Sequence, residues 1–341
     1  MPTIPLARIH APNDVRLDTV DMPRPGPDDV LIRVERCGIC GSDLTYAKLG
    51  GIPGTVSPFA LGHEFAGEIV ETGANVAHLA VGDRVVVNPE AAANRIGSSG
   101  LRGAFSPYIV FENAAADRQG ILPLPAGLDY DLGALVEPLS VGMHGANQGK
   151  VTRGDKVVIF GAGPVGLAAG VAAKYFGAES VVIADLSECR LAVARELGLQ
   201  TFSAGSESLT AFLRRTHGTV TNDPLLGEQP ATDVFIEATG VGAVFTELCE
   251  SARKGARIVV VGVHFQSVEL NMINLLMKEL VITAATQYPV EFPQVLDMLQ
   301  SGAVDVRPMI SHHFPLSQFV SAFSQAQKPG EAVKVIVHCQ K

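Results

Sequence analysis

Apolar residues follow two different patterns along this chain of 341 residues. In the first third, short strand-like segments are broken by glycine and proline, which is typical of β-strands joined by tight turns. We expect strands at Val30–Arg36, Gly67–Glu71 and Arg84–Asn88, with turns at Pro25–Pro27 and Val81–Asp83. This region therefore predicts a small barrel or a bent sheet.

The pattern changes at Asp155. A continuous apolar run at Val157–Phe160 ends at a glycine and is followed by a helical pattern through Lys174. Four further strand-like runs, with helical stretches between them, are Val181–Ala184, Asp233–Glu237, Arg257–Val261 and Leu280–Ala284. The first of them leads into a helix-like stretch at Ser187–Leu197. Apolar strands that alternate with helices predict a parallel, doubly wound sheet.

The rest of the chain fits around this sheet. The polar segment Thr216–Ala231 contains proline and glycine, and we interpret it as a surface excursion between two units. After Glu291 we expect a helix, then a segment at Phe314–Ala326 and a closing strand at Ala332–His338. This tail is expected to return to the first domain.

Composition limits the classes of partner. The length favours two domains, and 47% hydrophobic with 18% charged residues is the balance of a compact globule. A net charge of −9 argues against nucleic acid and anionic membranes, which need a basic surface. No apolar stretch approaches the roughly 20 residues of a membrane-spanning helix, and no signal peptide is evident. Five scattered cysteines suggest a reducing compartment, so we expect the cytoplasm.

The glycine motif is the first candidate site. Gly161-Ala-Gly163-Pro164-Val165-Gly166 fits G-x-G-x-x-G, directly after an expected strand and at the start of an expected helix. The first glycine permits the tight turn, the second lets a pyrophosphate approach the backbone, and the third allows close packing of helix and strand. A lone motif of this kind also occurs as a packing turn, but here Asp185 ends the next strand, as dinucleotide binding requires.

Asp185 also bears on the choice of cofactor. A carboxylate there accepts hydrogen bonds from the ribose hydroxyls of NAD and repels a 2′-phosphate, so NAD is favoured over NADP. Arg190, on the following helix, leaves NADP open.

Several thiol, imidazole and carboxylate groups could hold a metal: Cys40, His63, Glu64 and Glu137. Catalytic zinc takes such ligands and keeps one position open, where it ionises an alcohol before hydride transfer to a nicotinamide. Spacing alone does not identify the site. Cys37-x-x-Cys40 could equally be a redox pair, half a zinc finger or two buried thiols, and His63 alone is more often a core histidine.

In combination the motifs are more specific. Gly-Ile-Cys40-Gly-Ser-Asp, Gly-His63-Glu64-Phe-Ala-Gly, Glu137-Pro-Leu-Ser-Val and the glycine turn occur in the order found in the zinc-containing medium-chain dehydrogenase/reductase family, which the chain resembles. Within it, the chain is similar to the branch of sorbitol, L-threonine and sugar-acid (L-idonate, L-galactonate) dehydrogenases. The resemblance implies an α/β fold, with a Rossmann coenzyme domain at 148–287 and a mainly β, GroES-like catalytic domain at 1–147 and 288–341.

The resemblance also implies roles for individual residues. Cys40 and His63 are zinc ligands, and Glu64 and Glu137 share the remaining coordination. Ser42 passes the substrate proton outward, Tyr46 lines the substrate pocket and Asp43 supports the zinc region. Thr45 stands where the family has a relay histidine, which puts the outward proton path in doubt. We assign further cofactor contacts beyond the glycine turn and Asp185 to Arg190, Thr239 and Gly262.

Two departures from the family pattern matter. The lobe that holds a structural zinc in many relatives has no cysteine here between Asn88 and Phe105, so we expect one zinc per chain. The position of a substrate-gripping arginine of the polyol enzymes is taken by Gln287, followed by Tyr288. Arg95 or Arg102 could instead supply a cation for a sugar-acid carboxylate, although a plain surface role is at least as well supported.

These observations predict an NAD-dependent zinc dehydrogenase of a secondary alcohol, most plausibly a polyol or sugar acid. An L-threonine or 2,3-butanediol type of dehydrogenase is the alternative within the branch, and a zinc-free quinone or enoyl reductase is disfavoured by the metal motifs. A non-enzymatic relative would be expected to lose ligands or Ser42. The resemblance further implies a homodimer or homotetramer joined through a sheet edge, for which 257–263 and 280–284 are candidates.

Overall fold

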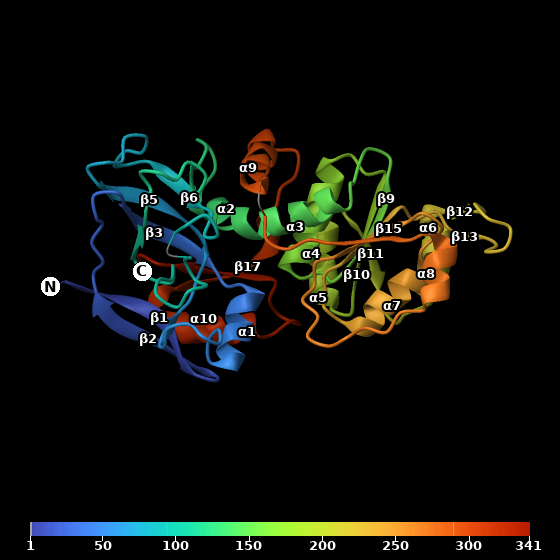
Figure 1. The fold of residues 1–341 in the computed structure, drawn as a ribbon, viewed down its shortest axis with the longest axis horizontal. Coiled ribbons are helices and arrows are strands. Elements are labelled where there is room, and N and C mark those ends of the chain that lie inside the picture. The colour runs from blue at the N-terminus through green and yellow to red at the C-terminus, as the bar shows by residue number, and fades with distance from the viewer. Residues whose placement is uncertain (1, 94, 289) are drawn as a thin grey trace. The chain divides into compact units, whose positions relative to one another are not determined.

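The computed structural model describes residues 2–93, 95–288 and 290–341 (Figure 1). Internal contacts divide the chain into two compact units, one of Met1–Glu137 with Ile310–Lys341 and one of Pro138–Met309. The sequence placed the domain boundaries at 147/148 and 287/288. The second unit therefore takes in the helix before the first parallel strand and the segment that leads up to residue 309.

The first unit is mainly β. Its elements are β1 (Thr3–Ala11), β2 (Asp14–Asp21), β3 (Val30–Gly38), α1 (Gly41–Leu49), β4 (Phe59–Ala60), β5 (Glu64–Thr72), β6 (Arg84–Val87), β7 (Tyr108–Phe111), β8 (Ile121–Pro123), α2 (Tyr130–Ala134), β17 (Ile310–Pro315), the 3₁₀ turn η2 (Leu316–Gln318), α10 (Phe319–Ala326) and β18 (Lys334–His338). One sheet has the order β17-β18-β3-β5-β6-β8, with β7 also paired to β3, and a smaller one has the order β2-β1-β4.

Strand β3 organises this unit. It pairs antiparallel with β5, β7 and β18, and its alternate residues Val30, Ile32 and Val34 are fully buried. Valine and isoleucine suit such positions because branched side chains pack well on a pleated surface. The pairing of β18 with β3 confirms that the tail of the chain returns to the first domain.

The second unit contains α3 (Val136–Gln148), β9 (Lys156–Phe160), α4 (Pro164–Tyr175), β10 (Ser180–Asp185), α5 (Glu188–Glu196), β11 (Gln200–Ser203), α6 (Leu209–His217), β12 (Thr219–Val220), β13 (Gln229–Pro230), β14 (Val234–Glu237), α7 (Gly242–Ser251), β15 (Arg257–Val260), α8 (Met272–Lys278), β16 (Val281–Ala284), α9 (Glu291–Ser301) and the 3₁₀ turn η1 (Arg307–Met309). The first two residues of α3 belong to the first unit.

Its sheet has the order β11-β10-β9-β14-β15-β16, and every pair of neighbours is parallel. This is the order of a doubly wound dinucleotide-binding fold, and the predicted fold class is confirmed. The strand order reverses between β9 and β14, so the turn after β9 lies at the point where such sheets bind ligands. The prediction of a surface excursion fits the small β12–β13 ribbon, which extends from this unit (Figure 1).

One prediction about the sheet edge is wrong. β15 lies between β14 and β16, so 257–263 cannot form the free edge, because both sides of that strand are already paired. β16 is the terminal strand of the order and has exposed residues along its length. Of the two predicted segments, β16 therefore remains the candidate for the sheet edge that joins subunits.

Candidate active site

Cys40, His63 and Glu64 come together in the first unit. The register of β3 and β5 pairs Gly38 with Glu64, which brings the segment after β3 to the start of β5. One ligand atom from each of Cys40, His63 and Glu64 lies within 4.8 Å of the other two. His63 is 8% exposed and Glu64 1% exposed, so the cluster is shielded while Cys40 stays partly open.

Asp43 holds the parts of this cluster together. It is fully buried on α1, and its carboxylate accepts hydrogen bonds from the backbone N–H of Cys40 at 2.9 Å and of Gly62 at 3.4 Å. The same carboxylate lies 3.6 Å from His63 Nδ1. Burial raises the pKa of Asp43, against the lowering effect of His63. Burial lowers the pKa of His63, but the negative charges of Asp43 and Cys40 outweigh it, and the net shift is strongly upward.

A buried lysine that we did not predict completes the cluster. Lys334, on β18, is 1% exposed, and its Nζ donates to both oxygens of Glu64 at 2.6 and 2.7 Å and to the Ile39 carbonyl at 3.0 Å. Burial lowers the pKa of Lys334, but the Glu64 carboxylate more than compensates and raises it. The sequence did contain a signal, because Lys334 interrupts the apolar strand Ala332–His338, and buried lysines are rare unless paired.

The other expected residues of this site lie around the cluster at different depths. Glu137 is 6% exposed, and its charge acts on both His63 and Lys334. Ser42 is half-buried on α1. Tyr46, on the same helix, packs edge-to-face on Phe59, and burial raises the pKa of its phenol, while His63 lowers it and Cys40 raises it further.

The donor set fits a metal such as zinc. Sulfur, nitrogen and carboxylate oxygen are the ligand types that zinc takes in proteins. His63 Nδ1 is buried and has no hydrogen-bond partner, while the Asp43 carboxylate lies close to it. Metal-binding histidines usually orient their second ring nitrogen against such a carboxylate. The residues present are therefore suited to hold the ion that the resemblance implies.

A second group of possible ligands lies elsewhere in the same unit. Asp131, His313 and His338 bring their ligand atoms within 4.8 Å of one another, and His313 Nδ1 is 2.9 Å from His338 Nε2. Arg36 donates to the Asp131 carboxylate at 2.8 Å. A guanidinium in that position opposes a bound cation, so this group is better explained as a surface network.

The glycine turn has the geometry that its sequence predicts. Gly161 has a φ of +102°, Gly163 precedes α4, and Pro164 begins it, as expected for proline in a first helical turn. A Cβ added at Gly166 would lie 1.7 Å from the Gly161 carbonyl oxygen, whereas one at Gly163 would lie 3.9 Å from its nearest neighbour, Arg190 Nη1. The third glycine is thus required by packing, and the second leaves space above the turn.

Asp185 and Arg190 flank this turn. The Asp185 carboxylate accepts from the backbone N–H of Ala162 at 2.6 Å and of Ser187 at 2.7 Å, so it ties the end of β10 to the glycine turn. Arg190 Nε is buried without a hydrogen-bond partner. The structure therefore brings both residues to the place where a dinucleotide would lie.

Thr239 and Gly262 meet around a buried carboxylate. Glu237, at the end of β14, accepts from the backbone N–H of Thr239 at 2.6 Å and of Gly240 at 2.9 Å, and from His264 Nε2 at 2.8 Å. A Cβ at Gly262 would lie 2.2 Å from the Gly240 nitrogen. His264 is thus part of this network.

The two candidate substrate residues, Arg95 and Gln287, are both exposed. Arg95 lies at a turn with a φ of +44° in the first unit, and Gln287 has a φ of +61° in the second. Tyr288, next to Gln287, is buried and packs against Phe292.

Two further observations bear on the setting. All five cysteines are free thiols, and none lies between Asn88 and Phe105. Across the described part of the chain, every helix is too short or too polar to cross a membrane.

These two units define the architecture of a two-domain dehydrogenase, and comparisons with known proteins identify its family. The family model for the alcohol dehydrogenase GroES-like domain matches residues 26–126, and that for zinc-binding dehydrogenases matches residues 164–301. The chain is 35% identical to sorbitol dehydrogenase of Bos taurus, with 97% of this chain and 95% of the relative covered. The chain therefore belongs to the zinc-binding alcohol dehydrogenase family.

Solved structures agree with this assignment. The structure of 2R,3R-butanediol dehydrogenase from Bacillus subtilis superimposes with a TM-score of 0.86 at 29% identity, covering 98% of this chain and 99% of the other. A zinc-binding dehydrogenase of Sinorhizobium meliloti 1021, bound to NADP, has a TM-score of 0.85 at 28% identity, covering 99% and 100%. Both are dehydrogenases, and this chain is an oxidoreductase of the same family.

Proposed function

We propose that this chain is an NAD-dependent, zinc-assisted dehydrogenase that converts a secondary alcohol of the polyol or sugar-acid class to the ketone. The observation that carries the proposal is the convergence of Cys40, His63 and Glu64 within 4.8 Å in a chain of this family. The reaction takes a hydride from the carbinol carbon and releases the hydroxyl proton. The reaction needs a Lewis acid that stabilises the negative charge on the alcohol oxygen, and a cofactor that accepts the hydride.

Cys40 and His63 would hold the zinc ion, with Glu64 and Glu137 sharing the remaining coordination. Bound zinc supplies a Lewis acid that favours ionisation of an alcohol near neutral pH. Asp43 would orient the His63 ring from 3.6 Å. Because no cysteine is available for a structural lobe, we expect one zinc per chain, and metal analysis of the purified protein that finds two would contradict this.

Two residues on α1 would act on the substrate. Ser42, two residues after Cys40, would accept the alcohol proton and pass it outward, and Tyr46 would line the substrate pocket. Thr45 donates to the Gly41 carbonyl at 3.1 Å, so its hydroxyl is already engaged within the helix. We therefore expect protons to leave Ser42 directly to solvent rather than through residue 45.

The second unit would bind NAD. The glycine turn from Gly161 through Gly163, Pro164 and Val165 to Gly166 would receive the pyrophosphate at the start of α4. Asp185 would accept hydrogen bonds from the ribose hydroxyls of NAD and would disfavour NADP. The remaining contacts to the cofactor would come from Arg190, Thr239 and Gly262. Because a structurally similar dehydrogenase was solved with NADP bound, the choice between NAD and NADP has to be tested.

The Asp185→Ser variant tests this cofactor choice. Asp185 also ties the glycine turn to β10, so the variant is judged by the ratio of kcat/KM for NAD to that for NADP, which cancels general damage to the site. We expect the ratio to fall by about tenfold or more, because a charge that repels the 2′-phosphate is removed. An unchanged ratio would show that Asp185 does not select the cofactor.

The names of two similar proteins favour the polyol class: sorbitol dehydrogenase of Bos taurus and galactitol-1-phosphate dehydrogenase of Escherichia coli. The similarity to 2R,3R-butanediol dehydrogenase instead supports the alternative within the branch. Arg95 and Gln287 are proposed as substrate contacts, with the arginine suited to a carboxylate.

The decisive experiment is NAD reduction by the purified protein with polyols, aldonates, L-threonine and 2,3-butanediol, before and after chelation. We expect turnover of a polyol or aldonate that chelator abolishes and added zinc restores. Preference for L-threonine or 2,3-butanediol would move the chain to the alternative within the branch. Full activity without a transition metal, or reduction of quinones instead, would refute the proposal.

We also propose that the chain is a homodimer or homotetramer that works on a small molecule in the cytoplasm. Strand β16 leaves one edge of the parallel sheet open, and exposed apolar residues on α8 and β16 lie beside it: Met272, Ile273, Leu276, Val281 and Ile282. Exposed apolar residues concentrated on an edge strand and the helix before it favour a protein interface. The free thiols are compatible with a reducing compartment.

A further inference from the structure

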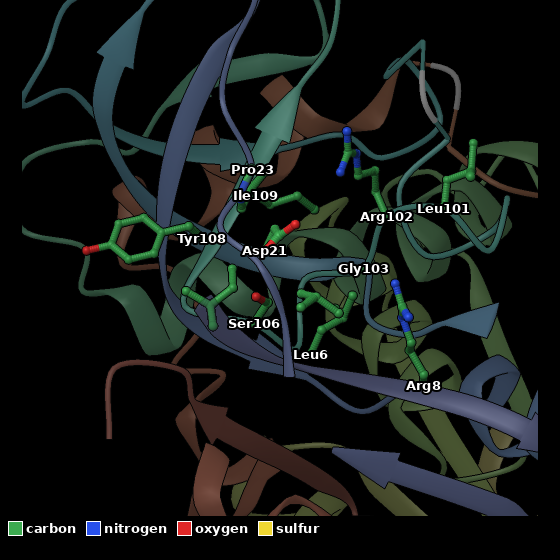
Figure 2. A pocket seen from close by; sticks show the side chains of 12 residues that line it. Leu6, Arg8, Asp21, Pro23, Leu101, Arg102, Gly103, Ser106, Tyr108 and Ile109 are labelled. Atoms are coloured by element: carbon green, nitrogen blue, oxygen red, sulfur yellow. The ribbon is translucent and has the colours of Figure 1, made fainter. Parts of the chain in front are cut away.

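A pocket of about 160 Å³ lies in the first unit, on strands β1 and β2 and the loop that leads into β7. Figure 2 shows Arg8, Asp21, Arg102 and Ser106 among the side chains that surround it. Cys40, His63 and Glu64 do not contribute to its wall. The pocket is thus separate from the candidate metal cluster, and its size is close to the roughly 150 Å³ in which a protein cavity can hold benzene.

Among the residues that the structure describes, two buried polar atoms of this pocket have no hydrogen-bond partner. Ser106 is 2% exposed, and its Oγ has no hydrogen-bond partner. Arg8 Nε is also buried without one. Leaving such groups unsatisfied destabilises the folded state, and more so for a charged group. Buried polar groups without a partner are rare in native structures, and a molecule bound in the pocket that both residues line would account for these two.

The two arginines are incompletely neutralised. The nearest carboxylate oxygen to Arg8 is that of Asp18, at 3.8 Å from Nη1, and Arg102 Nε is 3.7 Å from Glu112. Both distances exceed a hydrogen bond, and neither guanidinium donates one to any residue that the structure describes. Guanidinium groups of this kind are suited to bind a carboxylate through two parallel hydrogen bonds.

The rest of the pocket restricts the ligand. Ile4 and Leu6 line it beside Arg8, because alternate residues of β1 share one face. Asp21 pairs with Thr3 near the opposite end of β1, about 17 Å along the strand from the register position of Arg8. An apolar wall suits a short hydrocarbon body, and the carboxylate of Asp21 would repel a second negative charge.

We propose that this pocket binds a small organic monocarboxylate, with its carboxylate at Arg8, Arg102 and Ser106 and its apolar body against Ile4 and Leu6. The ligand satisfies the unpartnered Ser106 hydroxyl and Arg8 Nε together. This site is distinct from the substrate site of the proposed dehydrogenase, so its occupancy does not depend on that function.

Calorimetric titration of the full-length, zinc-loaded protein tests the proposal. The probe is 2-methylpropanoate, with 2-methylpropanamide as its uncharged analogue and inorganic phosphate as an anion without an apolar body. We expect one saturable site per chain for the carboxylate, and affinities at least about tenfold weaker for the amide and for phosphate, because each lacks part of the recognised chemistry.

Variants locate the site. Arg8→Met keeps the apolar stem and is expected to weaken carboxylate binding about tenfold or more, whereas the exposed Arg118→Met in the same unit changes it by less than about twofold. Ser106→Ala, which removes only one hydroxyl, is expected to weaken binding about threefold or more and serves if Arg8→Met does not fold. Cys40→Ala is expected to leave binding intact.

Several results would overturn the proposal. They are the lack of a saturable site, equal affinity for the amide, tighter binding of phosphate, and wild-type affinity in Ser106→Ala. Binding that disappears in Cys40→Ala but persists in Arg8→Met would place the carboxylate on the metal instead.

Discussion

At the scale of single residues, the pair formed by Lys334 and Glu64 dominates the energetics of the candidate metal cluster. Both side chains are 1% exposed, and the lysine lies 2.6–2.7 Å from both carboxylate oxygens. An isolated charge at that depth is strongly disfavoured, so each partner makes the burial of the other possible. The lysine also fixes the orientation of the Glu64 carboxylate, which makes it a positioning residue for that group.

A double-mutant cycle in chelator-treated protein measures this pair. Lys334→Met is expected to destabilise the folded state by about 3 kcal/mol or more, because it leaves the Glu64 carboxylate buried and unpaired. Adding Glu64→Gln to that variant is expected to recover much of the loss, because the unpaired charge is gone. The measurement is the free energy of urea unfolding, with the exposed Lys48→Met as control. Strictly additive effects would show that the two groups are not coupled.

His217 makes a second prediction, which concerns pH. Its ring is 1% exposed and hydrogen-bonded to Thr232 Oγ1 at 2.7 Å and Ser180 Oγ at 3.1 Å. Burial, assisted by the positive charge of Lys156 and opposed by Asp233, lowers the pKa of this histidine from 6.5 to about 4. Between these two values the unfolded chain binds more protons than the folded one. Stability is therefore lost as the pH falls from 6.5 to 4.

The loss attributable to His217 amounts to at most about 3 kcal/mol. We expect His217→Gln to show a smaller drop in unfolding free energy than the wild type between pH 7 and pH 4.5, whatever its stability at pH 7. The exposed His78→Gln is the matched control and should keep the wild-type dependence. An equal drop in all three proteins would mean that His217 is not held neutral in the folded state.

At the scale of secondary-structure elements, the glycines at the junction of β9 and α4 have different roles. Gly166 is needed for packing, whereas Gly163 is expected to serve dinucleotide binding. Gly166→Ala forces a Cβ to 1.7 Å from the Gly161 carbonyl oxygen, so the helix must shift, and we expect a loss of more than about 2 kcal/mol in unfolding free energy. Gly163→Ala meets only the Arg190 side chain at 3.9 Å and should cost about 1 kcal/mol or less.

Gly163→Ala, which should cost little stability, is the variant expected to weaken NAD binding directly. The added methyl group of Gly163→Ala occupies the space through which a pyrophosphate approaches the backbone, so we expect weaker NAD binding in a protein of nearly normal stability. Calorimetric titration with NAD beside urea unfolding checks both halves. If Gly163→Ala bound NAD with wild-type affinity, the hypothesis that the pyrophosphate binds at this turn would be wrong.

The elements also show what local sequence could predict. β9, α4, β10 and α5 lie within one or two residues of their predicted bounds, because continuous apolar strands and a glycine turn are local signals. In the first unit the strands were predicted only in part. Their order and register depend on contacts between distant segments, such as β3 with β18.

The same distinction applies to the candidate site. The sequence identified Cys40, His63 and Glu64, and the structure brings them together. It did not identify Lys334, whose partner lies 270 residues away in the chain. The Arg8–Ser106 pocket also joins segments far apart in the sequence, so no local spacing could have predicted it.

At the scale of the whole molecule, the open edge at β16 predicts association. Leu276, on α8 beside that edge, is 72% exposed, and burying such a side chain against a second copy would be favourable. In a two-fold symmetric dimer each substitution occurs twice at the interface. We therefore expect Leu276→Glu to shift the protein toward monomer in sedimentation velocity at micromolar concentration.

Val81→Glu provides the control for this prediction. Val81 is 63% exposed and lies between β5 and β6 in the first unit, whereas α8 and β16 belong to the second. The same chemical change there should leave the assembly as it is, since the site adds a charge without touching the proposed interface. If both variants dissociate, the effect comes from added charge in general. If the wild-type protein is itself monomeric, the apolar surface along α8 and β16 must serve some purpose other than pairing two copies of this chain.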